Sequence, residues 1–294
     1  MIHRSRGGRL LEGSMRLGVI FDRDLPPERL TPFAEALDGL PAVDDLWVVE
    51  DLGWTGGISS AATALAATSR LRVGIGITPA PLRNPMLLAM ELANLARLHP
   101  GRLAAGIGHG VPAWMAQAGV AAPSPLALLE ETITAVRALL RGETVTLHGT
   151  SVHLDGLSLV HPPQEVPPVL AGVLGPRSLA LSGRVAQGTI LPEGFGPKRI
   201  GAALERIGAI GEHELVTFTH LYIGDDVAGA TGPIVADTAQ FLKVTPEEVT
   251  LAAGTAEEAA AQVKGLWAAG AGTVAVRPIG SDPLSHVNRL LSAL

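Results

Sequence analysis

Short apolar runs alternate along the chain with longer segments in which apolar residues recur at intervals of three and four. The short runs predict buried β-strands, and the longer segments predict amphipathic helices that cover them. Eight such strand–helix pairs in one α/β chain favour a closed (β/α)8 TIM barrel. The expected strands are 16–21, 46–49, 71–77, 103–107, 169–171, 188–191, 216–223 and 273–276.

The helix signals are clearest in segment 85–98. Asn84 can cap this helix, Pro85 suits its first turn, and Leu88 and Leu92 share one face. The sequence His-Pro-Gly at 99–101 then ends the helix. The other expected helices are 26–40, 59–69, 126–141, 177–182, 197–211, a long stretch before Gly270, and 283–294.

Two segments depart from the strand–helix rhythm. Segment 142–167 alternates apolar and polar residues around glycine-containing turns, which predicts a β-hairpin inserted before the fifth strand. Residues 1–14 are basic and lack the apolar run of a signal peptide, so we expect a disordered leader. No linker interrupts the remainder, and one domain over 15–294 is the expected organisation.

Composition narrows the class of protein. The 294 residues are 47% hydrophobic, which is ample for one large core. The absence of cysteine excludes disulfides and thiolate metal sites and fits a cytoplasmic location. A net charge of -6 and 3% aromatic residues argue against a nucleic-acid partner. No apolar run is long enough to span a membrane, and no histidine pattern indicates a metal site.

Two carboxylates and a histidine are the candidates for proton transfer. A TIM barrel places its active site at the carboxyl ends of the strands. Glu50 and Asp51 follow the second strand, so one side chain should face the barrel mouth and the other should point outward. His109 lies among the glycines that follow the fourth strand. Ion pairing is the alternative to proton transfer for the two carboxylates. For His109 the alternative is a structural side chain whose hydrogen bonds are satisfied within the protein.

A glycine-rich helix start is the candidate anion site. Gly175 can cap a helix that begins at Pro176, and the N–H groups of Arg177 and Ser178 would then point towards an anion such as phosphate. An ordinary helix start with an exposed arginine is the alternative. Three basic residues follow the sixth and eighth strands: Lys198, Arg199 and Arg277. They could bind a phosphate or be ordinary solvated surface charges, and the sequence favours neither. The apolar segment 111–125 is either a lid or a packing loop.

Four stretches in this order resemble the bacterial luciferase-like monooxygenase superfamily, in particular its branch of oxidoreductases that use the deazaflavin coenzyme F-420. They are LWVVEDLGW, LRVGIGITPAPLRNPMLLAMELANLARLHPGRLAAGIGHG, LLEETITAVRALLRGETVTLHG and GPRSLALSGRVAQGTIL. The resemblance implies hydride transfer between F-420 and a small organic substrate, and a homodimer. The alternatives are an FMN-dependent monooxygenase and a non-catalytic flavin- or deazaflavin-binding protein.

The resemblance also implies where the cofactor binds. Members carry a bulge at the end of the third strand, usually with a non-prolyl cis peptide bond that backs the ring; here this bond is Gly76–Ile77. We expect Gly76, which lacks a Cβ, to let the ring approach the backbone. The cofactor contacts implied are Gly76, Ile77, Thr78, Gly106, Ile107, Gly108, His109, Gly172, Val173, Leu174, Gly175, Pro176 and Arg177.

Catalytic and substrate residues follow from the same resemblance. An acid or histidine after the second strand assists related enzymes, and the matching residues are Glu50 and Asp51. Some relatives read Asp-His where this chain reads Glu-Asp, so a histidine role does not carry over to that position. Others have an acid soon after the fourth-strand glycines, and since this chain has none before Glu130, His109 is the remaining candidate there. Trp54 is expected to line the substrate side together with Trp114 of segment 111–125. The few charges at the rim indicate a neutral or weakly polar substrate.

Overall fold

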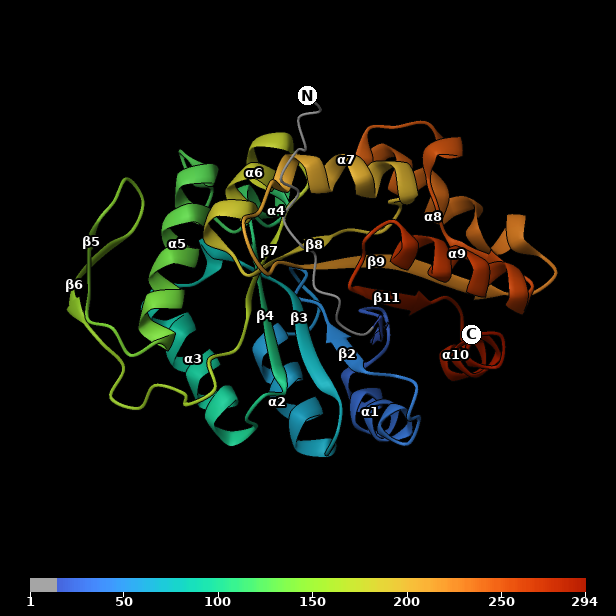
Figure 1. The fold of residues 1–294 in the computed structure, drawn as a ribbon, viewed down its shortest axis with the longest axis horizontal. Coiled ribbons are helices and arrows are strands. Elements are labelled where there is room, and N and C mark those ends of the chain that lie inside the picture. Colours follow the sequence, from blue (N-terminus) through green and yellow to red (C-terminus); the bar gives the residue numbers. More distant parts are fainter. Residues whose placement is uncertain (1–14) are drawn as a thin grey trace, which may run out of the picture.

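Eight parallel strands form a closed barrel in the computed structural model, which describes residues 15–294 (Figure 1). The predicted leader 1–14 lies outside these residues. Each strand pairs in parallel with its neighbour, and pairing of β8 with β9 completes the ring. This confirms the predicted TIM barrel. The strands are β1 (Arg16–Ile20), β2 (Asp45–Val48), β3 (Arg72–Pro79), β4 (Leu103–Gly108), β7 (Val169–Gly172), β8 (Gly188–Leu191), β9 (Glu214–Ile223) and β11 (Thr273–Pro278).

Helices follow the strands and cover the outside of the barrel (Figure 1). The bounds of α3 match the prediction because Asn84 accepts a hydrogen bond from the Met86 N–H at 2.8 Å and Pro85 occupies the first position. Within residues 15–294 no helix is long and apolar enough to cross a membrane. The helices are α1 (Leu30–Asp38), α2 (Gly57–Ala67), α3 (Pro85–Leu98), α4 (Pro112–Gln117), α5 (Pro125–Leu140), α6 (Pro176–Val185), α7 (Pro197–Ile207), α8 (Val227–Leu242), α9 (Ala256–Ala268) and α10 (Pro283–Leu291), with short 3₁₀ turns η1 (Pro27–Arg29), η2 (Ala80–Leu82) and η3 (Pro246–Glu248).

The chain between β9 and β11 is more divided than expected. The predicted long helix is two helices, α8 and α9, separated by η3 and a short strand β10 (Ala252–Gly254) that pairs with the end of β9. Thr255 and Glu258 form a capping box that starts α9 afresh. The predicted hairpin is confirmed as β5 (Val145–His148) and β6 (His153–Leu157), which protrude beside α5 (Figure 1).

Large side chains fill the barrel interior. Trp47 is fully buried there, with its ring centroid 5.4 Å from that of Phe218. A Cβ at Gly74 would lie 2.3 Å from the Trp47 ring, and a Cβ at Gly76 would lie 2.5 Å from Phe218. The missing Cβ of Gly76 therefore makes room for the core, and contact of the Gly76 backbone with a cofactor ring stays a prediction.

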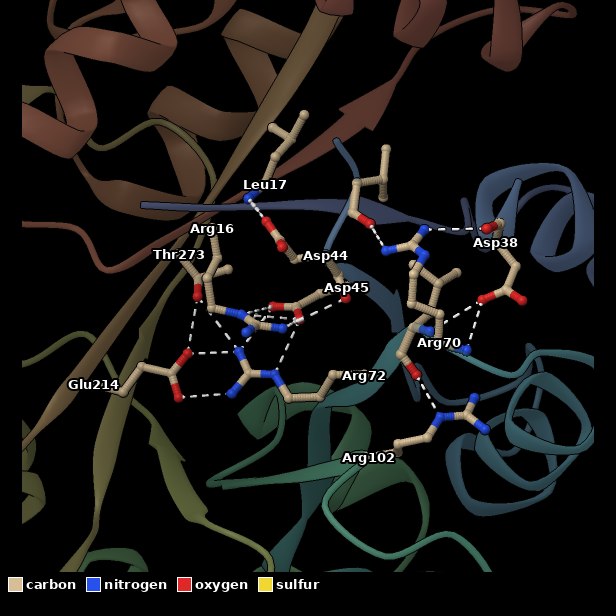
Figure 2. Close-up of polar contacts among 12 residues, drawn as sticks. Arg16, Leu17, Asp38, Asp44, Asp45, Arg70, Arg72, Arg102, Glu214 and Thr273 are labelled. Carbon is tan, nitrogen blue, oxygen red and sulfur yellow. Dashed lines mark hydrogen bonds and ion pairs between the residues drawn. The ribbon is translucent and has the colours of Figure 1, made fainter. Parts of the chain in front are cut away.

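A layer of polar side chains closes the end of the barrel at which the strands begin (Figure 2). The fully buried Asp45 binds both Arg16 and Arg72. Arg72 also donates to both carboxylate oxygens of Glu214, at 2.6 and 2.9 Å, and Glu214 accepts a further bond from the Thr273 hydroxyl at 2.9 Å. The layer joins strands from opposite parts of the sequence and leaves the carboxyl-terminal mouth as the functional end.

Candidate functional site

The inward-facing side chains change from apolar to charged at the mouth. Strand side chains alternate between two faces, so residues two positions beyond an interior residue also point inward. The interior cluster contains Ile20, Val49, Phe218 and Ala275. The same faces therefore continue at the rim into Asp22, Asp51, His220 and Arg277.

Arg277 stands at the centre of an ion cluster. Its Nε donates to Glu193 Oε1 at 2.7 Å, and its Nη1 lies 3.8 Å from Asp22 Oδ2. Burial alone would lower the pKa of Arg277, but Glu193 and Asp22 raise it above its usual value. Burial alone would raise the pKa of Glu193, whereas Arg277 brings it below its usual value. Both partners are therefore charged at neutral pH.

His220 adds an uncharged hydrogen-bonding group to this cluster. It lies opposite Arg277 in the register of β9 and β11. Burial and the nearby Arg277 lower the pKa of His220, with Glu193 and Asp22 acting in the opposite direction. Its Nδ1 is buried and has no partner within residues 15–294. The sequence analysis missed His220 and Glu193; the alternation in VTFTHLYI was the available signal for His220.

The two predicted carboxylates point to opposite sides, as expected. Glu50 faces outward, where it accepts a bond from the Gly57 N–H at 2.6 Å and binds Arg83. This carboxylate fastens the end of β2 to the start of α2, which favours a structural role over proton transfer. Asp51 faces the mouth and accepts a bond from Arg23 at 2.6 Å.

The structure brings the two predicted substrate residues together. The rings of Trp54 and Trp114 lie 5.9 Å apart between centroids, and α4 carries Trp114. Trp54 Nε1 donates to Asp24 at 2.9 Å, and the guanidinium of Arg23 lies 4.5 Å from the Trp54 ring centroid. Contact of these rings with a substrate stays a prediction, as does the lid role of segment 111–125.

The peptide bond between Gly76 and Ile77 is cis, as the resemblance implied, and the β3–β4 register shifts between Ile75 and Thr78. The Ile77 side chain is half-buried at the mouth and packs over Gly172, where a Cβ would lie 2.3 Å from Ile77 Cγ2. Contact of Ile77 with a planar ring stays a prediction.

Several other predicted cofactor contacts face away from the mouth or are already covered. Ile107 and Val173 lie in the core between barrel and helices, and Thr78 is 1% exposed. A Cβ at Gly106 would meet the Ile75 carbonyl oxygen at 2.2 Å, and one at Gly108 would meet the Gly172 oxygen at 2.8 Å. These two glycines thus permit close packing of strands and of Ile77.

The start of α6 has the features of an anion site. Gly175 provides no side-chain cap, and within residues 15–294 the N–H groups of Arg177 and Ser178 have no hydrogen-bond partner. His109 Nε2 lies 2.9 Å from the Ser178 hydroxyl. Burial lowers the pKa of His109, and the backbone of Pro125 acts in the opposite direction. These groups fit a phosphate at a helix N-terminus.

Comparison with known proteins identifies relatives of this chain. It is 28% identical over 196 residues to 5,10-methylenetetrahydromethanopterin reductase of Methanolobus tindarius, covering 66% of this chain and 59% of the relative. It is 30% identical over 151 residues to F-420-dependent glucose-6-phosphate dehydrogenase of Microbacterium testaceum, covering 50% of this chain and 43% of the relative. The chain thus spans about half the length of these relatives.

Solved structures share the fold. The F-420-dependent tetrahydromethanopterin reductase of Methanopyrus kandleri matches with a TM-score of 0.78 at 18% identity, covering 90% of this chain and 93% of that one. An F-420-dependent secondary alcohol dehydrogenase matches with a TM-score of 0.80 at 17% identity, covering 96% and 98%. The family model described as luciferase-like monooxygenase matches residues 26–282. The chain therefore belongs to the luciferase-like monooxygenase family.

Proposed function

We propose that this protein is an F-420-dependent oxidoreductase that transfers a hydride between the coenzyme and a small organic substrate. The names of relatives support the choice of coenzyme. The observation that carries the proposal is the anion site at α6, where the free N–H groups of Arg177 and Ser178 lie beside the Ser178 hydroxyl that His109 Nε2 contacts. A phosphate-bearing redox coenzyme requires such a site beside the barrel mouth.

We propose a role towards the coenzyme for each part of this site. The N–H groups of Arg177 and Ser178 would hold its phosphate, and His109 would orient the Ser178 hydroxyl. The half-buried Ile77 would cover one face of the ring. When bound, the deazaflavin supplies a hydride donor or acceptor.

Asp51 and His220 are the groups that we propose for proton exchange with substrate. Both follow the inward face of their strands to the mouth. His220 is uncharged at neutral pH because burial lowers its pKa, so its imidazole can both donate and accept a hydrogen bond. We do not assign proton exchange to Glu50, because its carboxylate binds Arg83 and the Gly57 N–H.

We further infer that two copies associate through α3. Leu87, Met90 and Leu98 on this helix are 48%, 50% and 65% exposed, which is unusual for large apolar side chains gathered on one element. Sedimentation equilibrium should show a dimer for the wild type and a monomer for Met90→Asp. A monomeric wild type would refute this inference.

Titration of the apo-protein with F-420 and with FMN, followed by fluorescence, tests the proposal. We expect saturable micromolar binding of F-420 and no binding of FMN. FMN binding without F-420 binding would assign the protein to the FMN-dependent monooxygenases. F-420 binding without turnover of ketones, alcohols or sugar phosphates would indicate a carrier and would contradict the oxidoreductase proposal.

A further inference from the structure

Arg277 follows the inward face of β11 to the barrel mouth, and carboxylates already occupy its guanidinium. Glu193 accepts from its Nε at 2.7 Å, and Asp22 lies 3.8 Å from its Nη1. The Arg277 side chain is 12% exposed and that of Glu193 is 17% exposed. An arriving ligand therefore meets a shielded ion pair instead of a free cation.

The backbone holds Glu193 in this position. The chain leaves β8 and turns at Gly194, whose φ of 92° favours glycine. A Cβ at Gly194 would lie 2.6 Å from Thr238 and 2.8 Å from Leu242. The Gly194 carbonyl oxygen accepts a hydrogen bond from the Thr250 N–H at 3.2 Å. The approach of Glu193 to Arg277 is thus built into the packing between β8 and α8.

Carboxylates outnumber guanidiniums around Arg277. Arg23, another guanidinium near the mouth, binds Asp51 at 2.6 Å, and the adjacent Asp24 binds Trp54. These two guanidiniums thus face four carboxylates, which are Asp22, Asp24, Asp51 and Glu193. An anionic substrate group would be repelled here unless it displaced a carboxylate.

An uncharged polar group would instead find a suitable partner in His220. Its imidazole lies beside Arg277 in the strand register and is only partly buried, so part of the ring is open to a ligand. A hydroxyl or carbonyl oxygen can form a hydrogen bond with a neutral imidazole without displacing Glu193.

We infer that Glu193 determines substrate specificity by occupying Arg277, so that the mouth accepts an uncharged alcohol or carbonyl compound and rejects phosphorylated or carboxylated ones. The inference rests on the proposed oxidoreductase function and assigns its substrate class. Removal of Glu193 should expose Arg277 and convert the mouth into a site for small anions.

The test measures the melting temperatures of the full-length wild type and of Glu193→Ala in acetate and in phosphate, against chloride at equal ionic strength. We expect a saturable upward shift that is several degrees larger for Glu193→Ala than for the wild type, in which the start of α6 can bind phosphate as well. The difference should disappear in Glu193→Ala/Arg277→Met, which removes the exposed cation. Glu143→Ala is the matched control, because it removes a carboxylate from the exposed Arg141–Glu143 pair.

Equal shifts for the wild type and Glu193→Ala, or no shift for Glu193→Ala, would overturn the inference. If Glu193→Ala does not fold, Glu193→Gln keeps the side-chain shape and is judged by the same outcomes. F-420 titration of the same variants separates this inference from the proposed function. Unchanged F-420 binding with a new anion shift supports both. An anion shift in a protein that never binds F-420 refutes the proposed function, and with it the substrate class, but not the occupation of Arg277 by Glu193.

Discussion

Glycines at positions 18, 74 and 76 line the barrel interior where Trp47 and Phe218 fill it. The sequence identified Gly76 as exceptional but assigned its missing side chain to a ligand. Phe218 is 142 residues away from Gly76 in the sequence. The pattern around Gly76 cannot predict which distant side chain will pack against it. His220 was accessible to sequence reasoning, since alternation along β9 places it on the face of Phe218.

Gly76→Ala should destabilise the fold by about 1–3 kcal/mol, because the added Cβ would overpack against Phe218. Urea unfolding measures the change. A double-mutant cycle with Phe218→Leu should show coupling, because the smaller side chain relieves the clash.

Gly201→Ala is the matched control, because a Cβ there meets nothing within 4 Å inside α7. This variant should gain about 0.5–1 kcal/mol from helix propensity. Gly76→Ala with unchanged stability would mean that Phe218 does not fill the space beside Gly76.

At the scale of elements, signals carried within one segment were read correctly. Asn84 and Pro85 sufficed to predict α3, and Pro176 to predict the start of α6. The division between α8 and α9 was missed although Thr255 and Glu258 form a capping box. The short strand β10 could not be predicted, because only its pairing with the end of β9 makes it a strand.

The start of α6 allows binding to be separated from stability. Arg177→Glu places a carboxylate in the first helical turn, where the helix dipole stabilises it by about 0.3–1 kcal/mol. The same charge should repel the coenzyme phosphate and weaken F-420 binding at least tenfold. Parallel thermal unfolding and F-420 titration measure both effects, and unaltered F-420 affinity would place the phosphate elsewhere.

Asp38, at the end of α1, ties that helix to the start of β3. Burial alone would raise the pKa of Asp38, but bonds from the N–H groups of Ser69, Arg70 and Leu71 lower it from 3.8 to about 2. The bonds therefore stabilise the fold fully above pH 3.8, and this contribution is lost as the pH falls through about 2.

The stability difference between wild type and Asp38→Asn should accordingly shrink as the pH falls from 3.8 to about 2. Urea unfolding at a series of pH values measures this difference. A difference that stays constant over the range would show that the Asp38 carboxylate is not held by these bonds.

At the scale of the whole molecule, the strand–helix rhythm predicted the barrel because every unit repeats the same apolar pattern. The charged layers at its two ends were not predicted, since each joins residues from several strands. For example, the single side chain of Arg72 on β3 binds both Asp45 on β2 and Glu214 on β9 (Figure 2). Such contacts depend on closure of the barrel.

Arg72→Met should destabilise the fold by about 3 kcal/mol, because it deprives the buried Asp45 of one of two partners. Arg141→Met, which breaks an exposed ion pair, should change stability by about 0–1 kcal/mol. Chemical unfolding compares the two variants. An equal loss of unfolding free energy in both variants would show that the polar layer contributes no more to stability than an exposed ion pair.

A crystal structure of the protein with F-420 would locate the coenzyme directly. It should show the phosphate on the N–H groups of Arg177 and Ser178, with the deazaflavin ring against Ile77 and its other face open towards His220. A coenzyme bound away from the barrel mouth, or a phosphate that does not contact the start of α6, would contradict the proposed site.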